Sequence, residues 1–573
     1  MEPLLSIEGL NVHFTSDGSN SVAVKSNSFS IKKGELVAIV GESGSGKSVT
    51  ALSVLQLLPR QAVVSGKALF FHADQQPVDL FKLSGKEISN IRGNQIAMIF
   101  QEPMTSLNPV FTCGYQVMEA IQLHQQVNKE IARQKTIELF QKVNLPDPDN
   151  LISRYPHELS GGQKQRVMIA MAMSCNPALL IADEPTTALD VTVQKTILEL
   201  IKSLQQQNNM GVIFITHDLG VVADIADKIL VMRKGEIVEQ GYTKDILLNP
   251  QHPYTKALLA CRPAGKAKGV RLPVVGDFIK QDSEIVIKNL AELEKPKTQD
   301  TNPKTQGTVL EVKNLHVHFP IKKNLFGKAT QFFKAVDDVS FTVQQGDIVG
   351  LVGESGCGKT TLGRSILQLI KPTSGKILLE GKDLIQTNAE ELRKMRKDLQ
   401  IVFQDPYGSL NPRITIGDAI LEPLKVHSVL LNGKKRKEKV MELLEKVSLD
   451  TDHFHRYPHQ FSGGQRQRIC IARALALNPS FLIFDESLSA LDVSVQAQVL
   501  NMLNDLKAEF GFTAIFISHD LSVVHYICKR ILVMYKGKIV EEGTADQVYN
   551  HPTNAYTKNL LNAIPGKSIL QSS

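Results

Sequence analysis

The sequence has no long apolar run and few cysteines. None of its apolar runs reaches the roughly 18 residues that a membrane-spanning helix needs, and its start, MEPLLSIEGL, lacks the basic segment of a secretory signal. Its six cysteines form no C-x-x-C pair and no zinc-ligand spacing. We therefore expect a chain that neither spans a membrane nor is secreted, in a reduced cytoplasmic setting.

The sequence also lacks a strong excess of charge of either sign. Its 65 basic and 58 acidic residues leave a formal net charge of +7 over 573 residues. A charge this small for the length of the chain does not indicate a nucleic-acid-binding protein. This charge is compatible with a position near anionic lipid without arguing for it. With 42% hydrophobic and 21% charged residues, the chain has the composition of an ordinary globular protein long enough for several domains.

The most informative feature is a series of motifs that occurs twice in the same order. Gly41 to Ser48 reads GESGSGKS and Gly353 to Thr360 reads GESGCGKT, and both fit the phosphate-loop pattern G-x-x-x-x-G-K-[ST]. Each loop follows a short apolar run, Leu36 to Val40 in the first half and Ile348 to Val352 in the second. This arrangement predicts a strand, a glycine loop and a helix in each half.

The spacing of the later motifs indicates that a whole domain is duplicated. Three pairs of matching residues each lie 302 positions apart, namely Ser160 and Ser462, Asp183 and Asp485, and His217 and His519. The loop lysines, Lys47 and Lys359, lie 312 positions apart, so the halves differ in length before the glutamines Gln101 and Gln404. Internal duplication is the simplest cause of such a pattern.

We predict an α/β fold with two tandem phosphate-loop domains, at residues 1–263 and 308–573, joined by a linker at 264–307. Apolar, strand-like runs alternate with helical patterns in each half, which favours a mostly parallel sheet flanked by helices, with a β subdomain beside it. Apolar residues spaced by three and four predict a helical subdomain at Gln116 to Val143 and around Lys434 to Val447. The linker, rich in Lys, Pro, Thr and Gln, is expected to be mostly extended, with an apolar patch at Ile285 to Leu290.

The glycine loops are expected to close their backbone N–H groups around nucleotide phosphates at the N-terminus of a helix. The lysines would reach the β- and γ-phosphates, and the hydroxyls of Ser48 and Thr360 would contact Mg²⁺. The loop residues expected to bind ATP are Gly41, Ser43, Gly44, Gly46, Lys47 and Ser48 in the first half and Gly353, Ser355, Gly356, Gly358, Lys359 and Thr360 in the second.

Each half also has an acidic pair at the end of an apolar strand, a strand-end histidine and a glutamine. The predicted magnesium ligands are Ser48, Gln101 and Asp183 in the first half and Thr360, Gln404 and Asp485 in the second. The predicted catalytic residues are the general bases Glu184 and Glu486, with His217 and His519 positioning water. Alone, an acidic pair could be a helix N-cap and a strand-end histidine could be structural, but the order of all six motifs favours the chemical interpretation.

The SGGQ segments form a second predicted anion site in each half. A serine hydroxyl, two glycine N–H groups and a helix N-terminus suit a phosphate, yet one fold cannot wrap its own nucleotide from both ends. Two domains paired head to tail can do so. The residues concerned are Ser160, Gly161, Gly162 and Gln163 in the first half and Ser462, Gly463, Gly464 and Gln465 in the second.

On these motifs both halves resemble the nucleotide-binding domains of ATP-binding cassette transporters. The resemblance implies that ATP lies between the phosphate loop of one half and the SGGQ of the other. The loops TTALD and SLSALD, which end at Asp190 and Asp492, match the family's contact between halves. We expect both sites to hydrolyse ATP. One departure from the family pattern is that DEPT in the first half is replaced by DESL in the second, with Ser487 where proline is common.

Several longer segments narrow the resemblance to the importers of dipeptides, oligopeptides and glutathione. They include IFQEPMTSLNPVFT, FQDPYGSLNPR, RYPHELSGGQ and the closing HPYT. The resemblance implies a peripheral protein at the cytoplasmic face of the bacterial inner membrane, with two permease subunits and a periplasmic binding protein as partners. The resemblance also implies that the permease docks on Met104 to Phe111 and Tyr407 to Ile414. ATPases of peptide importers often carry several cysteines after HPYT that hold an iron–sulfur cluster. Because only Cys261 lies near HPYT in this sequence, we expect no such cluster.

Three questions stay open at the level of sequence. Cys357, beside a cationic lysine and a helix N-terminus, could have a lowered pKa and be modifiable, or it could be a small residue that simply fits. Phe332 or Phe333 could stack on adenine in the second half, whereas the first-half stretch SNSVAVK has no aromatic residue, which predicts unequal ATP affinity. The residues do not distinguish glutathione from other peptides, peptide antibiotics or nickel chelates as cargo, and only the resemblance favours glutathione.

A soluble tandem cassette protein acting on ribosomes or DNA is the competing class. Ribosome-associated relatives would favour a long, charged, helical linker, whereas this linker is interrupted by Pro273, Pro296 and Pro303. DNA-repair relatives would favour zinc cysteines or long coiled coils, and the sequence has neither. The transport interpretation is therefore preferred.

Overall fold

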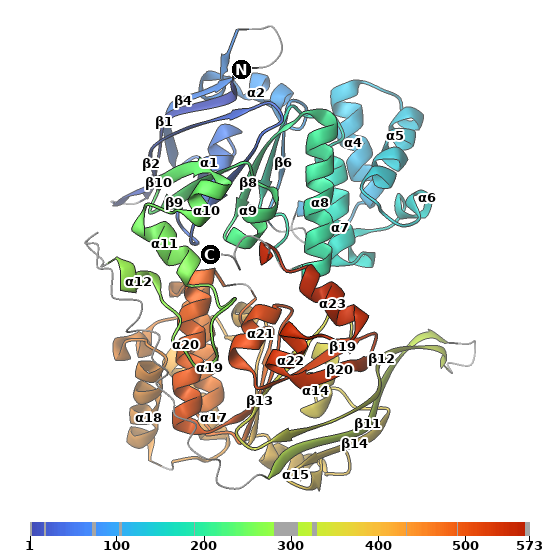
Figure 1. The fold of residues 1–573 in the computed structure, drawn as a ribbon, viewed down its shortest axis with the longest axis vertical. Coiled ribbons are helices and arrows are strands. Elements are labelled where there is room, and N and C mark those ends of the chain that lie inside the picture. Colours follow the sequence, from blue (N-terminus) through green and yellow to red (C-terminus); the bar gives the residue numbers. More distant parts are fainter. Residues whose placement is uncertain are drawn as a thin grey trace. The chain divides into compact units, whose positions relative to one another are not determined.

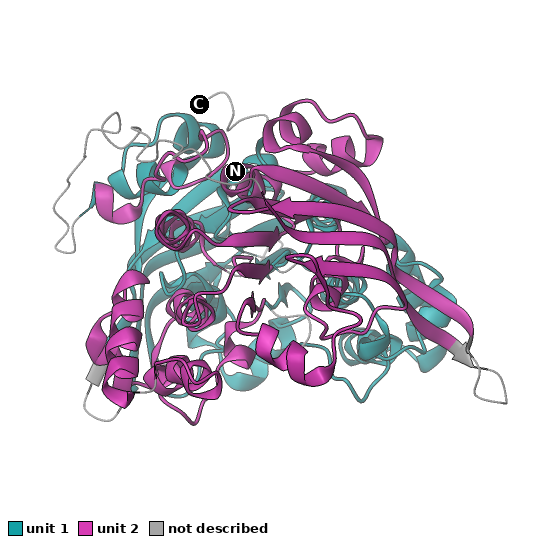
Figure 2. Ribbon diagram, turned by 90° about the horizontal axis from the view of Figure 1, so that it is seen from below, with its two compact units in different colours: residues 1–259, 278–285, 565–573 teal, residues 260–277, 286–564 magenta. Residues whose placement is uncertain are grey.

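The chain divides into two compact units that repeat one architecture (Figure 2). The computed structural model describes residues 3–16, 19–71, 76–101, 106–187, 189–279, 307–323, 329–430, 432–489 and 491–567. Unit 1 consists of Met1–Leu259, Phe278–Ile285 and Pro565–Ser573, and unit 2 of Ala260–Asp277 and Val286–Ile564. No helix in the described part of the chain has the length and apolar character needed to cross a membrane.

A six-stranded sheet forms the centre of unit 1. Its strand order is β10-β9-β3-β8-β7-β6, and all neighbours are parallel except β9 and β10. The strands are β3 (Leu36–Val40), β6 (Ile96–Ile99), β7 (Leu179–Asp183), β8 (Gly211–Thr216), β9 (Lys228–Arg233) and β10 (Glu236–Tyr242). The predicted mostly parallel sheet is confirmed, and the predicted site residues lie at or just after the carboxyl ends of its central strands.

The central strands are buried on both faces, which explains their continuous apolar sequences. In β8, Val212 and Phe214 pack into the cluster beneath the helical subdomain, whereas Ile213 and Ile215 pack into the cluster on the opposite face. This division follows from the two-residue period of a strand, and it leaves no position for a polar residue before the strand ends. The first polar residue after each run therefore lies at the sheet edge.

Two further layers complete unit 1 (Figure 1). An antiparallel sheet of order β2-β1-β4-β5 contains β1 (Pro3–Ser16), β2 (Ser19–Lys32), β4 (Ala62–Phe70) and β5 (Val78–Asp79). The helical subdomain contains α4 (Cys113–Gln125), α5 (Lys129–Lys142), α6 (Pro148–Leu151) and α7 (Gly161–Ala172), with α4, α5 and α7 packed on one another. Both subdomains were predicted and are confirmed.

The remaining helices of unit 1 follow the strands. They are α1 (Lys47–Val54), α2 (Gly85–Ile91), α8 (Val191–Asn208), α9 (Leu219–Ile225), α10 (Thr243–Leu248) and α11 (Pro253–Ala260). Asp190 caps α8, because its side chain accepts from the Val193 N–H at 2.9 Å. The short helix α12 (Val275–Phe278) lies farther along the chain.

Unit 2 repeats these layers. Its sheets have the orders β12-β11-β14-β15 and β16-β17-β18-β13-β19-β20. The strands are β11 (Thr308–Lys323), β12 (Ala329–Gln344), β13 (Ile348–Val352), β14 (Ser374–Leu379), β15 (Lys382–Asp383), β16 (Leu399–Val402), β17 (Phe481–Asp485), β18 (Thr513–Ile517), β19 (Arg530–Tyr535) and β20 (Lys538–Thr544). The helices are α14 (Lys359–Ile366), α15 (Ala389–Met395), α16 (Pro406–Ser409), α17 (Ile416–Val426), α18 (Gly433–Lys446), α19 (Gly463–Leu475), α20 (Val493–Phe510), α21 (Leu521–Ile527), α22 (Ala545–Asn550) and α23 (Ala555–Asn562).

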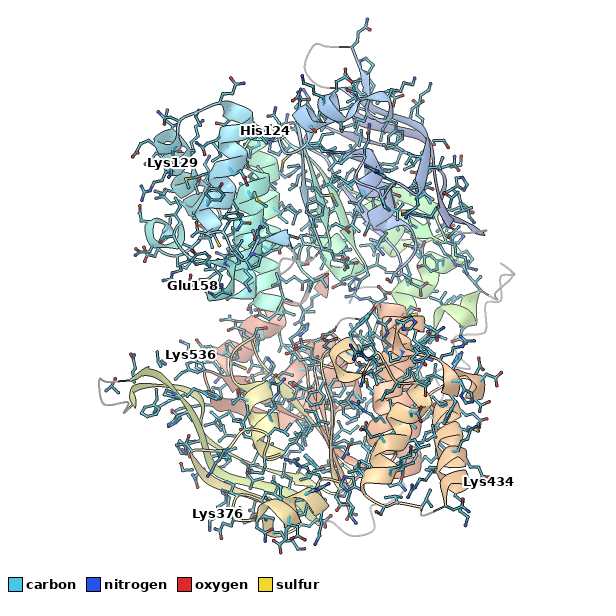
Figure 3. The ribbon with its side chains drawn as sticks, turned by 180° about the vertical axis from the view of Figure 1, so that it is seen from behind. His124, Lys129, Glu158, Lys376, Lys434 and Lys536 are labelled. Carbon is cyan, nitrogen blue, oxygen red and sulfur yellow. The ribbon has the colours of Figure 1, made fainter. Side chains whose placement is uncertain are left out.

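The helical subdomains of the two units correspond closely. Lys129 begins α5 and Lys434 is the second residue of α18, and both side chains are exposed (Figure 3). Asn128 and Asn432 cap the two helices by accepting backbone N–H groups. The equivalent caps show why the two polar, lysine-rich segments both begin a helix at this point.

The start of the predicted linker packs into unit 2. The Leu272 N–H donates to Asn501 Oδ1 at 2.9 Å, and Asn501 Nδ2 donates back to the Leu272 carbonyl at 2.8 Å, with both residues buried. The Tyr526 hydroxyl donates to the Val270 carbonyl at 2.7 Å. Residues 280–306, with the predicted apolar patch, lie outside the described residues, and the boundaries at 263 and 307 stay predictions.

We expect Asn501→Ala to loosen this segment. The substitution removes both hydrogen bonds and leaves buried backbone groups of Leu272 without a partner, at a cost of about 2–3 kcal/mol. Hydrogen–deuterium exchange of the peptide at 264–279 should accelerate by roughly 30- to 100-fold, if exchange occurs by local opening. Asp505→Ala is the matched control, because it removes only an exposed ion pair to Arg271 at 3.8 Å. Unchanged exchange in Asn501→Ala would contradict the anchoring role.

Candidate functional site

The glycine loops lie between the central strand of each sheet and the helix that follows it. Gly46 caps α1 with φ 102°, and Gly358 caps α14 with φ 111°, both in the left-handed region that favours glycine. A Cβ on Gly46 would lie 2.6 Å from the Ala23 carbonyl oxygen, and one on Gly358 would collide with the Ala335 carbonyl. These two glycines are therefore required by both conformation and space.

The lysine of each loop is buried and bonded to the loop itself. Lys47 Nζ donates to the carbonyls of Gly41 at 2.7 Å and Glu42 at 2.9 Å, with 5% of the residue exposed. Lys359 Nζ donates to the equivalent carbonyls of Gly353 and Glu354 at 2.7 and 3.0 Å. The ammonium groups hold the loops in a curved conformation that is suited to surround an anion.

The next residue of each loop contacts the predicted metal-binding aspartate. Ser48 Oγ donates to Asp183 Oδ1 at 3.1 Å, and Thr360 Oγ1 donates to Asp485 Oδ1 at 2.9 Å. Burial raises the pKa of Asp183 to about 6 and also raises the pKa of Asp485. A buried carboxylate and a hydroxyl at hydrogen-bond distance supply two of the hard oxygen ligands that Mg²⁺ prefers, so the residues fit this ion.

Glu184 links the predicted residues of three further segments in the first half. Its carboxylate accepts from Gln101 Nε2 at 3.1 Å and Thr187 Oγ1 at 2.9 Å, and it lies 3.3 Å from His217 Nδ1. Burial raises the pKa of Glu184, but the hydrogen bond and charge of His217 outweigh it, so the pKa falls to about 2. Glu184 is therefore ionised at neutral pH.

Both glutamates have a strained backbone. Glu184 has φ 46° and Glu486 has φ 48°, in the left-handed region that non-glycine residues rarely adopt. Their N–H groups donate to the carbonyls of Ile215 at 2.9 Å and Ile517 at 3.0 Å. Such strain costs about 1–3 kcal/mol per residue and typically occurs at functional sites.

The second half repeats this geometry with small differences around the glutamate. Glu486 accepts from Gln404 Nε2 at 3.0 Å, and it lies 3.7 Å from both His519 Nδ1 and Lys359 Nζ. Burial raises the pKa of Glu486, but His519 and Lys359 outweigh it, so the pKa is lowered. The Ser489 hydroxyl donates to the backbone carbonyl of Glu486, whereas Thr187 at the equivalent position bonds the Glu184 carboxylate.

The SGGQ segments each begin a helix with a capping box. Ser160 Oγ accepts from the Gln163 N–H at 3.3 Å, and Gln163 Oε1 accepts from the Ser160 N–H at 3.0 Å. Ser462 and Gln465 make the same pair of bonds at the start of α19. The glutamines thus shape the helix N-terminus.

The two glycines of each SGGQ have different environments. A Cβ on Gly162 would lie 2.7 Å from Val193 Cγ1, and one on Gly464 would collide with Val495, so both are required by close packing against the following helix. Gly161 and Gly463 have room around them. The pairing of each SGGQ with the phosphate loop of the other half stays a prediction.

Two sequence-based expectations about individual residues have clear outcomes. The proposed lowering of the Cys357 pKa is wrong, because Cys357 is buried and burial raises its pKa despite the neighbouring Lys359. Ser487, the departure from the family pattern, is also buried, and its hydroxyl has no hydrogen-bond partner in the part of the chain that the structure describes. It replaces a buried proline, Pro185, with an unsatisfied polar group.

The predicted docking and stacking residues have exposed apolar side chains. Val110 and Tyr407 are 70% and 65% exposed, and Phe332 and Phe333 are 50% and 51% exposed. Residues 104 and 105 of the first docking segment lie outside the described residues. These exposures fit contacts with a partner and a base, and the contacts themselves stay predictions.

Sequence reasoning missed the tyrosine of the HPYT segments. Tyr254 and Tyr556 contact the second residue of their own phosphate loops through hydrogen bonds of 3.1 and 3.0 Å. The available signal was their spacing, because the two tyrosines lie 302 residues apart, like the histidines His217 and His519. The segment was recognised only as a similarity to peptide importers.

Two family models match the chain, each of them twice. The model described as ABC transporter matches residues 24–187 and 336–489. The model described as oligopeptide/dipeptide transporter, C-terminal region, matches residues 238–275 and 540–569. The chain belongs to the ABC transporter family, and its two halves are ATP-binding cassettes with ATPase activity.

Curated relatives match the chain over nearly its whole length. It is 48% identical over 565 residues to the glutathione import ATP-binding protein GsiA of Pectobacterium atrosepticum, covering 98% of this chain and 89% of that protein. It is 50% identical, with the same coverage, to the proteins of that name from Shigella sonnei and Escherichia coli K12. Among solved structures, a dimeric ATP-binding cassette in a post-hydrolysis state is 28% identical, covering 41% of this chain and 98% of that one, with a TM-score of 0.38.

We expect Cys357 to resist alkylation at neutral pH. Its raised pKa leaves less thiolate at pH 7.5 than an ordinary cysteine has, and the thiolate fraction grows only as the pH rises above that range. Iodoacetamide labelling read by mass spectrometry should therefore modify the half-buried Cys175 before Cys357. Faster labelling of Cys357, with an activity loss that Cys357→Ser prevents, would restore the modifiable-thiol hypothesis.

Proposed function

We propose that this protein is the ATP-hydrolysing subunit of a bacterial importer for peptides, with glutathione as its cargo. The observation that carries the proposal is the identity of 48–50% over 98% of the chain to proteins named for glutathione import. The two peptide-transporter C-terminal regions support the cargo class independently. The proposed domains are residues 1–263 and 308–573, joined by a linker at 264–307.

We assign ATP binding to the glycine loops. The ammonium groups of Lys47 and Lys359 are already held beside the loop backbone, 2.7 Å from the carbonyls of Gly41 and Gly353. The phosphates of ATP provide a stronger acceptor for these lysines than neutral carbonyls do. Mg²⁺ would be held by Ser48, Asp183 and Gln101, or by Thr360, Asp485 and Gln404, and would neutralise developing phosphate charge when bound.

Glu184 and Glu486 are the proposed general bases. Glu184, which is ionised at neutral pH, accepts a hydrogen bond from the attacking water and orients it toward the γ-phosphate. Gln101 and His217 hold this carboxylate from two sides, at 3.1 and 3.3 Å. Release of the γ-phosphate thus changes the surroundings of Gln101, which directly precedes the proposed permease-docking segment.

We propose that the two ATP sites are completed by head-to-tail pairing of the cassettes, on the family pattern. The first site joins Lys47, Gln101, Asp183, Glu184 and His217 to Ser462, Gly463 and Gly464, and the second joins Lys359, Gln404, Asp485, Glu486 and His519 to Ser160, Gly161 and Gly162. ATP binding favours the closed pair, and hydrolysis removes the γ-phosphate contacts that stabilise it.

The proposed location is the cytoplasmic face of the inner membrane, with two permease subunits and a periplasmic binding protein as partners. The relatives named import ATP-binding proteins support this assignment. The exposed side chains of Val110 and Tyr407 are available for the permease. The binding protein and the permease, which contact the cargo, would determine its identity.

The combined substitutions Glu184→Gln and Glu486→Gln test the base assignment. Glutamine keeps the size of the side chain but cannot accept a proton, so steady-state ATP hydrolysis should fall by about 10²- to 10⁴-fold. Radiolabelled ATP should remain bound through gel filtration. The two single variants measure how much each site contributes, and rapid turnover by the double variant would contradict the assignment.

Uptake of labelled glutathione tests the cargo. Cells carrying the Lys47→Ala, Lys359→Ala form should lose uptake that the unchanged protein supports, because both loops lose the cation that binds phosphate. A labelled dipeptide is measured in parallel. If the variant loses only dipeptide uptake, the cargo is another peptide and not glutathione. If neither uptake changes although the unchanged purified protein hydrolyses ATP normally, the proposal that the protein serves a peptide importer is contradicted.

A further inference from the structure

A tyrosine hydroxyl is bonded to the phosphate loop in both halves. The Glu42 N–H donates to Tyr254 Oη at 3.1 Å, and the Tyr254 hydroxyl donates to Glu42 Oε2 at 3.3 Å. In the second half the Glu354 N–H donates to Tyr556 Oη at 3.0 Å. The tyrosine bond therefore occurs twice, at equivalent positions of two halves that have otherwise diverged in sequence.

The residue held by the tyrosine is also held by the loop lysine. The Glu42 carbonyl accepts from Lys47 Nζ at 2.9 Å, and the Glu354 carbonyl accepts from Lys359 Nζ at 3.0 Å. The peptide groups on both sides of each glutamate are thus fixed, one by the tyrosine and one by the lysine. The tyrosine bond is made to the glutamate N–H and this lysine bond to the glutamate carbonyl, so the tyrosine bond does not depend on the position of the lysine.

The environment of each tyrosine fixes its ring. Tyr254 is fully buried, and the guanidinium carbon of Arg233 lies 5.4 Å from its ring centroid. Tyr535, which is equivalent to Arg233, lies with its ring centroid 4.2 Å from that of Tyr556. Burial raises the pKa of Tyr254, so its hydroxyl stays protonated and able to donate.

A carboxylate supports the segment that carries each tyrosine. Glu239 on β10 accepts from the N–H groups of Gln251 at 2.7 Å and His252 at 3.2 Å, just before α11. Glu541 on β20 accepts from those of Thr553 at 2.7 Å and Asn554 at 3.3 Å, just before α23. The start of each tyrosine-bearing helix is therefore hydrogen-bonded to the last strand of its main sheet.

The tyrosine helices also lie next to the points where the chain passes between units. α11 ends at Ala260, the first residue of the segment that belongs to unit 2. α23 ends at Asn562, and Pro565 begins the segment that belongs to unit 1, where the Gly566 N–H donates to Asp224 Oδ2 at 3.0 Å. Each tyrosine is thus separated from the nearby crossing only by its own eight-residue helix.

We propose that Tyr254 and Tyr556 are positioning residues that keep the phosphate loops in their nucleotide-accepting conformation and so link the peptide-transporter C-terminal regions to ATP binding. The inference rests on the proposed function, since it takes the loops to be the ATP sites. It assigns a role to a region of the chain that the hydrolysis chemistry does not otherwise use. The tyrosines touch the loop and not the reacting atoms.

Tyr254→Phe with Tyr556→Phe tests the proposal in the purified full-length protein. Phenylalanine keeps the ring and its packing and removes only the hydroxyl. The KM for ATP and the Kd of a fluorescent ATP analogue should rise about three- to tenfold, the range that corresponds to one net hydrogen bond. The kcat at saturating ATP should stay within about twofold, because the residues around Glu184 and Glu486 are unchanged.

Tyr549→Phe is the matched control. Tyr549 is a buried tyrosine in the same C-terminal region, and its hydroxyl lies 3.5 Å from Ser522 Oγ rather than against the loop. It should change thermal stability without changing the KM for ATP. An unchanged KM in the double variant, or an equal rise in Tyr549→Phe, would overturn the proposal.

The same measurements separate this inference from the proposed function. If the unchanged protein binds and hydrolyses ATP and the double variant binds ATP equally well, only the role of the tyrosines is overturned. Unchanged protein that neither binds nor hydrolyses ATP overturns both. The cargo assignment is tested only by uptake, so its failure leaves the tyrosine result standing.

Discussion

The hydrogen bonds of the buried lysine ammonium group are the interaction on which the conformation of each phosphate loop depends. Placing a cation in a position where only 5% of Lys47 or 3% of Lys359 is exposed costs several kcal/mol unless it is hydrogen-bonded. The loop carbonyls provide those bonds, and they can do so only because the glycines allow the backbone to curve around the amine. The lysine and the loop backbone thus hold each other in one conformation.

Two neighbouring carboxylates at the edge of the same sheet have opposite pKa shifts. Burial raises the pKa of Asp183 to about 6, whereas the bonds from His217 and Thr187 help lower that of Glu184 to about 2. A divalent cation held by this aspartate would favour its charged form, because an opposite charge favours ionisation. Glu184 is ionised without a bound cation, and its backbone adopts the strained left-handed conformation.

The sequence was sufficient for much of the fold, whereas its assignment of residues to the nucleotide phosphates stays a prediction. Strand runs such as Leu36–Val40 are buried on both faces, so they are apolar throughout, and the phosphate loop begins directly after this one, at Gly41. The rise in the Cys357 pKa could not be predicted from its neighbours in the sequence, because burial outweighs the lowering effect of Lys359. The contact of Tyr254 with Glu42 spans 212 residues, so no local pattern predicts it.

The two halves differ more around the proposed general base than around the loop lysine. The lysine-to-carbonyl distances are 2.7 and 2.9 Å in one half and 2.7 and 3.0 Å in the other. Around the glutamate, by contrast, the histidine lies at 3.3 Å in one half and at 3.7 Å in the other, and Thr187 and Ser489 bond different atoms. Ser487 adds a buried hydroxyl next to Glu486, where the first half has Pro185. Duplication within one chain permits this divergence, because the two halves are always made together and each can change while the other keeps the shared arrangement.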